Sequence, residues 1–240
     1  MRSPLETALL DHASLSILGM CKNAGKTTVL NRLIALLQND PRTLALTSIG
    51  RDGETMDVVT GTEKPGIWAR IGTLIATAAD MLRYCDTTRE ILHTTGVGTP
   101  LGEVVVFRAL SDGFVQLAGP STREQLIALL KTLRDLGAGI VLIDGAISRK
   151  SLGAPSVSEA AILCTGASYH PDMDTVVRDT AYACELLTLP TSEHHHARRH
   201  VLPGAATDAV VNGLKLIPGD EVTVTDPSRV LVSRPLFERL

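Results

Sequence analysis

A short glycine-containing loop constrains the fold of this chain more than any other feature of its sequence. Residues 19–28 read GMCKNAGKTT; a strand-like run, SLSILG, precedes them, and apolar residues recur at helical spacing over residues 25–38. At such a strand–loop–helix junction, backbone N–H groups and the helix dipole favour the binding of phosphate oxygens. The sequence therefore predicts a phosphate-binding loop (P-loop) within an α/β domain.

The residue types in this loop match the requirements of nucleotide binding. Gly25 lets the backbone turn close to the phosphates, Lys26 would reach the β- and γ-phosphates, and the Thr27 hydroxyl would ligate Mg²⁺. The spacing is G-x5-G-K-T instead of G-x4-G-K-[ST], and Met20 stands where the first glycine is expected. The expected nucleotide-binding residues are Lys22, Asn23, Ala24, Gly25, Lys26, Thr27 and Thr28. The alternative is a plain strand–turn–helix connection.

Two acidic residues that follow other strand-like runs are candidates for the magnesium side of the site. Asp144 ends the apolar run IVLID, and Asp52 follows the run at residues 43–49. Ligands of open α/β sheets bind at the carboxyl ends of strands, where carboxylates can hold Mg²⁺ or orient water. The candidate catalytic residues are Lys26, Asp52 and Asp144, and the candidate metal ligands are Thr27, Asp52 and Asp144. The alternatives are a polar strand end at Asp144 and an exposed turn at Asp52.

The rest of the sequence alternates between strand-like and helix-like segments, which predicts a mostly parallel sheet with helices on both faces. Helices are expected at residues 73–84, 121–136 and 172–182, and strands at 90–94, 103–109, 114–117, 139–143, 159–165 and 185–189. Ser121 and Glu124 have capping-box spacing, and Gly137 stands where a helix-ending glycine belongs. The expected architecture is a single P-loop NTPase domain over residues 1–240, with residues 191–240 as a C-terminal extension of the same sheet.

Composition and charge exclude several classes of protein. The 240 residues are 44% hydrophobic and carry a net charge of −3, which indicates a globular chain without general affinity for nucleic acid or acidic membranes. The sequence contains neither an apolar run of about 18 residues nor a secretory signal pattern. The four cysteines lack metal-ligand spacing, so we expect reduced thiols and a cytoplasmic location.

A histidine cluster near the C-terminal end suggests a second kind of site. His196 and His200 would share one face of a helix and so allow a metal site, with His194 and His195 beside them. Apart from Glu193, the neighbouring sequence offers no carboxylate or thiol ligand, which favours a solvated loop. Whether the cluster binds a metal stays open at this point.

Three motifs together resemble a specific family. The stretches CKNAGKTTVLN at residues 21–31, SIGRDGE at 48–54 and LIDGA at 142–146 are similar to the P-loop subunit of the reactivating factor for lysine 5,6-aminomutase and ornithine aminomutase, and the resemblance covers residues 14–235. It implies an ATP- and Mg²⁺-dependent chaperone that releases damaged adenosylcobalamin from the mutase. The resemblance places the nucleotide role on Asn23, Gly25, Lys26, Thr27 and Thr28, and the magnesium role on Asp52 and Asp144.

The implied partners are the cobalamin-dependent aminomutase, a second reactivase subunit, or both, and association into a homodimer stays open. Two alternatives compete with this interpretation. The longer loop spacing also resembles dethiobiotin synthetase, which implies an ATP-dependent ligase acting on a small carboxylate, with Lys22 and Arg51 available to bind the acid. A cofactor-insertion GTPase is the other, although the sequence lacks an N-K-x-D motif for guanine.

Overall fold

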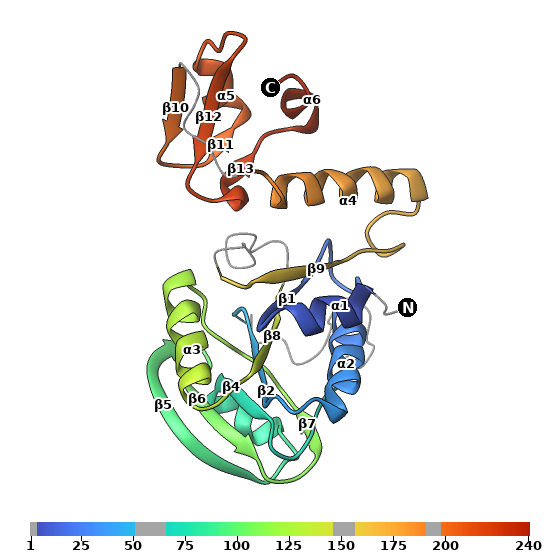
Figure 1. Ribbon diagram of the computed structural model, residues 1–240, viewed down its shortest axis with the longest axis vertical. Coiled ribbons are helices and arrows are strands. Elements are labelled where there is room, and N and C mark those ends of the chain that lie inside the picture. The colour runs from blue at the N-terminus through green and yellow to red at the C-terminus, as the bar shows by residue number, and fades with distance from the viewer. Residues whose placement is uncertain (1–3, 51–65, 146–156, 191–197) are drawn as a thin grey trace. The chain divides into compact units, whose positions relative to one another are not determined.

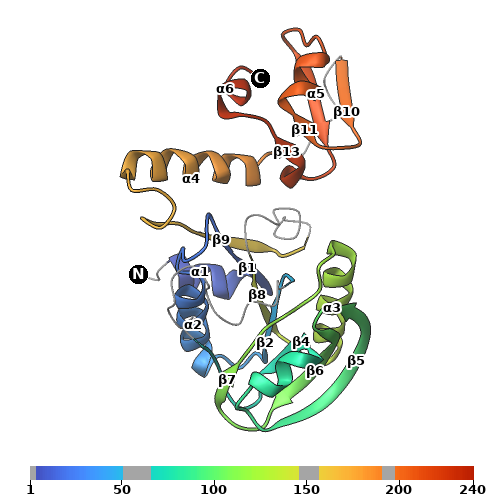
Figure 2. The same cartoon turned by 180° about the vertical axis from the view of Figure 1, so that it is seen from behind.

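The computed structural model describes residues 4–50, 66–145, 157–190 and 198–240. The chain divides into two compact units, Met1–Tyr169 and His170–Leu240, each with its own apolar core. Figures 1 and 2 show the elements of both units from opposite sides. The sequence predicts a single domain over residues 1–240.

A seven-stranded sheet forms the centre of the N-terminal unit. In spatial order its strands are β5 (Arg89–Thr99), β6 (Gly102–Ala109), β4 (Leu74–Ala78), β2 (Leu44–Ser48), β8 (Ile140–Asp144), β1 (Ser14–Gly19) and β9 (Ala160–Cys164). Neighbouring strands from β4 to β9 are parallel, whereas β6 and β5 are antiparallel to their neighbours. Because β1 lies between β8 and β9, the carboxyl ends of these three strands meet at one edge, where open α/β sheets bind ligands.

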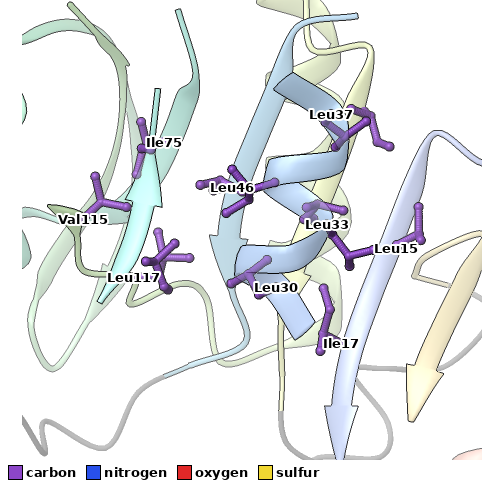
Figure 3. Packing of buried hydrophobic residues seen from close by; sticks show 14 of the residues in the cluster. Leu15, Ile17, Leu30, Leu33, Leu37, Leu46, Ile75, Val115 and Leu117 are labelled. Atoms are coloured by element: carbon purple, nitrogen blue, oxygen red, sulfur yellow. The ribbon is translucent and has the colours of Figure 1, made fainter. Parts of the chain in front are cut away.

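Helices cover both faces of this sheet, as the sequence predicted. Helix α2 (Lys26–Leu36) buries Leu30 and Leu33 against Leu15 of β1 and Leu46 of β2 (Figure 3). Helix α1 (Pro4–Asp11) adds Leu9 to the same cluster. Successive strand residues point to opposite faces, so Ala45 of β2 packs on the other side of the sheet, in a second cluster. Helix α3 (Arg123–Asp135) covers this second face with Leu126, Leu129, Leu130 and Leu133.

Four further short elements lie in the described part of this unit. They are the 3₁₀ helices η1 (Leu37–Asn39) and η2 (Ala79–Tyr84) and the antiparallel strands β3 (Ile67–Ala69) and β7 (Gly113–Val115). The helix predicted at residues 73–84 is therefore wrong in its first half. All five residues of β4 are buried, because this strand lies in the interior of the sheet between β2 and β6, and only the 3₁₀ turn after it is helical.

The ends of α3 correct one prediction and confirm another. Thr122, and not Ser121, caps the helix, and its hydroxyl oxygen accepts the Gln125 N–H at 3.3 Å. The capping box predicted for Ser121 and Glu124 is wrong because the helix begins one residue later than expected. Gly137 follows the helix with φ of 97°, which confirms the predicted helix-ending glycine.

The C-terminal unit is a small α/β assembly. It contains α4 (Met173–Leu187), β10 (Arg198–Leu202), β11 (Ala206–Thr207), α5 (Asp208–Gly213), β12 (Asp220–Val224), η4 (Pro227–Arg229), β13 (Val230–Leu231) and α6 (Arg234–Phe237). Strand β10 pairs with β12, and β11 pairs with β13, in two separate two-stranded parallel sheets. Its core includes Leu202, Val211 and Val230, and the Tyr182 hydroxyl of α4 donates to the Val232 carbonyl at 2.6 Å.

Two predictions for this region are wrong. Residues 185–189 are not a strand, because α4 continues to Leu187 and places Tyr182 and Leu186, four residues apart, in one apolar cluster. The described part of residues 191–240 does not extend the central sheet, because its strands pair with one another and bury their apolar side chains in their own core. Within the described ranges, every helix is too short or too polar to cross a membrane.

Candidate functional site

The loop between β1 and α2 has the backbone conformation that its sequence requires. Strand β1 ends at Gly19, and α2 begins at Lys26. Two residues between them are left-handed, Asn23 with φ of 60° and Gly25 with φ of 87°. Gly25 is the N-cap of α2 and has no side chain to cap it, and the first helical bond runs from the Val29 N–H to the Gly25 carbonyl at 3.0 Å. The N–H groups of the first helical turn therefore remain available for an anionic ligand.

The Lys26 side chain folds back over the end of β1. A Cβ atom placed on Gly19 would lie 2.9 Å from Lys26 Cδ and 3.0 Å from its Nζ. Only glycine at position 19 leaves room for this conformation, so the close approach explains the glycine that begins the motif. The ammonium group is thereby held at the start of the loop that leads into the helix N-terminus, where it adds positive charge to that of the helix dipole.

Asp144 lies on the strand next to this loop. It ends β8, where it is level with Ile17 of β1 on one side and Ser48 of β2 on the other. Its carbonyl accepts the Ile49 N–H at 2.7 Å, which holds the chain that leaves β2 against the end of β8. The side chain is half-buried, with its Oδ1 atom shielded from solvent.

A buried cysteine is influenced by both Lys26 and Asp144. Cys164 ends β9 directly opposite Gly19 and is buried. The pKa of the Cys164 thiol is higher than its ordinary value, chiefly because the thiol is buried. The positive charge of Lys26 opposes this increase, and the negative charge of Asp144 adds to it. Both charged groups therefore act on the same side chain, as expected if they face one site at the carboxyl ends of β1 and β8.

The other predicted residues of the loop differ in how far they are exposed to solvent. Ala24 is buried in the core, Thr27 is half-buried in the first turn of α2, and three side chains are exposed to solvent: Lys22, Asn23 and Thr28. Asp52 lies outside the described residues, as do Arg51 and Glu54. The described chain before them ends at Gly50, whose N–H donates to the Pro120 carbonyl at 2.8 Å.

Two supports of the site were missed by sequence reasoning. Gly119 packs on the end of β2, where its N–H donates to Ser48 Oγ at 2.9 Å. Ser168, in the loop after β9, donates its hydroxyl to the Asn23 carbonyl at 3.2 Å. Neither contact leaves a local motif in the sequence, because the partners are separated by 71 and 145 residues.

The histidine cluster is described only in part. His194, His195 and His196 lie outside the described residues. His200 Nε2 lies 3.1 Å from Asp220 Oδ2, and Arg198 Nη1 lies 3.6 Å from the same oxygen. Among the described residues, no group of three or more histidine, cysteine or acidic side chains is placed to hold a metal ion. His200 therefore contributes to a polar cluster of the C-terminal unit.

The geometry suits the binding of an anion that is accompanied by a metal ion. An uncapped helix N-terminus and an ammonium group face the same loop, and a threonine hydroxyl and a carboxylate lie at the neighbouring positions. Searches of protein-family models, curated proteins and solved structures found no match to this chain.

Proposed function

We propose that the N-terminal unit binds ATP with Mg²⁺ at residues 19–28 and hydrolyses it. The observation that carries this proposal is the position of the Lys26 side chain over Gly19, beside an uncapped helix N-terminus. A cationic side chain that folds back over its own loop is the arrangement expected of a P-loop lysine. A plain strand–turn–helix connection gives no reason for this close approach or for two left-handed residues in the loop.

The residues present fit a nucleotide and a magnesium ion. Backbone N–H groups of the loop and of the first turn of α2 would bind the phosphates, and Lys26 would bind the β- and γ-phosphate oxygens. Thr27 would ligate the metal ion directly, and Asp144 would hold its water shell from the adjacent strand. Mg²⁺ usually keeps several waters and few protein ligands, so one threonine hydroxyl and one carboxylate would be enough to hold it.

Each group also has a role in hydrolysis. Mg²⁺ supplies charge neutralisation for the phosphates when it is bound. Lys26 would stabilise the negative charge that develops between the β- and γ-phosphates as the bond to the γ-phosphorus breaks. Asp144 would fix the metal shell, and Asp52, on the evidence of the sequence, would hold a further metal water or orient the attacking water. The expected products are ADP and inorganic phosphate.

We further propose that this ATPase serves as the reactivating chaperone subunit for an adenosylcobalamin-dependent aminomutase. Support comes from the three sequence motifs: the one at residues 21–31 follows β1, the one at 48–54 begins at the last residue of β2, and the one at 142–146 includes the last three residues of β8. Nucleotide binding would change the loops at these strand ends, and hydrolysis would release them again. The partner would be the mutase itself or a second reactivase subunit.

The deciding experiment measures Mg²⁺-dependent ATP and GTP hydrolysis by the purified chain, alone and with a cobalamin-dependent aminomutase inactivated by turnover. Lys26→Ala should lose nucleotide binding and turnover while keeping its fold. Lys131→Ala removes an exposed lysine of α3 that pairs with Asp135, and it should behave as wild type.

Recovery of the mutase with ATP supports the chaperone role. Turnover indifferent to the mutase contradicts that role but not nucleotide binding, and unchanged binding by Lys26→Ala contradicts the site itself.

A further inference from the structure

The loop after β9 runs beside the candidate nucleotide loop. Strands β1 and β9 pair in parallel, with Gly19 opposite Cys164, so the segments that follow the two strands leave the sheet at the same level. The Met20 N–H donates to the Cys164 carbonyl at 2.9 Å, which fixes the first residue after β1. A turn closed by the Tyr169 N–H and the Gly166 carbonyl, at 2.9 Å, then returns the β9 loop toward residues 21–23.

Ser168 makes the second connection between the two loops. Its hydroxyl donates to the Asn23 carbonyl at 3.2 Å, and its oxygen lies 3.3 Å from the Cys21 sulfur. With its proton directed at Asn23, the Ser168 oxygen is left to accept the weak thiol donor of Cys21. One side chain thus contacts both the start and the middle of the nucleotide loop.

We propose that Ser168 is a positioning residue for phosphate binding, an inference that rests on the proposed nucleotide function. Asn23 holds a left-handed conformation that non-glycine residues adopt infrequently. Because a trans peptide is planar, anchoring the Asn23 carbonyl on Ser168 directs the Ala24 N–H to the opposite side of the chain. Ser168 thereby selects one orientation of the peptide group just before Gly25, in the part of the loop that would surround the phosphates.

Because Ser168 is exposed, its role in positioning the loop can be tested apart from any role in the stability of the fold. The side chain is exposed, so its removal should leave the core and the thermal midpoint of the protein unchanged. Ligand binding should change, because a loop with several peptide orientations binds in only one of them. A contact between Ser168 and the nucleotide base would be a different role, and it would leave the binding of phosphates without a base unaffected.

The experiment measures the dissociation constants of Mg²⁺–ATP and of inorganic triphosphate for Ser168→Ala, Ser168→Thr and wild type. We expect both ligands to bind about three- to tenfold more weakly to Ser168→Ala, and the threonine variant to restore binding. Ser111→Ala is the matched control, because Ser111 accepts the Thr88 N–H on the β5–β6 side of the unit. Weakened ATP binding with unchanged triphosphate binding would overturn the inference in favour of a base contact.

A second readout needs no nucleotide. In a Cys184→Ser background, Cys21 is the most accessible of the remaining cysteines, since Cys85 and Cys164 are buried. Ser168→Ala should raise the rate of Cys21 alkylation severalfold, and Ser168→Thr should not. If wild type binds neither ATP nor triphosphate, the nucleotide proposal fails, and an unchanged alkylation rate then shows that Ser168 does not order the loop either. Unchanged binding and unchanged alkylation together would overturn the Ser168 inference alone.

Discussion

At the scale of single residues, Gly19 and Lys26 depend on each other. A methyl group on Gly19 would lie within 3.0 Å of the Cδ, Cγ and Nζ atoms of Lys26, so the lysine would have to leave its position. We expect Gly19→Ala to weaken nucleotide binding about tenfold, equivalent to about 1.4 kcal/mol. Thermal stability should change little, because the displaced atoms belong to a flexible side chain.

The measurement is titration calorimetry with Mg²⁺–ATP alongside a thermal melt. Gly98→Ala is the control, because a Cβ atom built at Gly98 in β5 meets no atom within 4 Å outside Gly98 and its two neighbours in the chain. Wild-type affinity in the Gly19→Ala protein would show that the Lys26 position over Gly19 is not the one used in binding.

Among the secondary-structure elements, the start of α3 allows a test of which residue caps the helix: Ser121, as the sequence pattern predicts, or Thr122, as the structure shows. The Thr122 hydroxyl caps the helix, whereas Ser121 precedes it. Removing an N-cap hydroxyl costs about 1 kcal/mol of folding free energy, so Thr122→Ala should be destabilised by that amount. Ser121→Ala should stay within about 0.5 kcal/mol of wild type. Chemical denaturation measures both, and the reverse ranking would restore the capping box of Ser121 and Glu124.

The elements also show what could and could not be read from the sequence. The loop at residues 19–28 is local, since its strand, glycine, lysine and helix are consecutive, and their arrangement was predictable. The pattern at residues 74–78 predicts a helix wrongly, because a short apolar run in an interior strand has no periodicity that distinguishes it from a buried helix. The contacts of Ser168 with Asn23 and of Gly119 with Ser48 depend on how distant strands pair, which local patterns do not encode.

On the scale of the whole molecule, the two units have separate cores and should respond to different conditions. In the C-terminal unit, the Asp220 side chain is 2% exposed. Burial raises its pKa, but the Ile217 N–H and the neighbouring His200 and Arg198 outweigh burial, so the pKa is lower than its ordinary value. A carboxylate with a lowered pKa stabilises the folded state above its unfolded pKa, and this contribution is lost as the pH falls through the folded value.

Asp220→Asn should therefore destabilise the C-terminal unit at neutral pH, and the difference from wild type should disappear in strong acid. Hydrogen exchange followed across residues 198–240 from neutral pH into strong acid, well below the ordinary pKa of an aspartate, measures this. Asp135→Asn, at an exposed position on α3, serves as the control. A difference between Asp220→Asn and wild type that does not depend on pH would contradict the ionised carboxylate.

The separate cores further predict that nucleotide stabilises one unit only. The chain has a single tryptophan, Trp68 in β3, so tryptophan fluorescence follows the N-terminal unit, whereas far-ultraviolet circular dichroism follows both. At one hundred times its dissociation constant, Mg²⁺–ATP stabilises the protein that binds it by about 2.7 kcal/mol. The fluorescence midpoint of thermal unfolding should therefore rise by several degrees.

Leu202→Ala creates a cavity in the C-terminal core and should lower the stability of that unit by about 2 kcal/mol or more. It should leave the fluorescence midpoint and its response to nucleotide unchanged, while the dichroism melt gains an earlier transition. Leu133→Ala, in the core under α3, should do the opposite and lower the fluorescence midpoint. If Leu202→Ala lowers the fluorescence midpoint as much as the dichroism midpoint, the two units unfold together, and binding at the nucleotide loop must then stabilise the C-terminal unit as well.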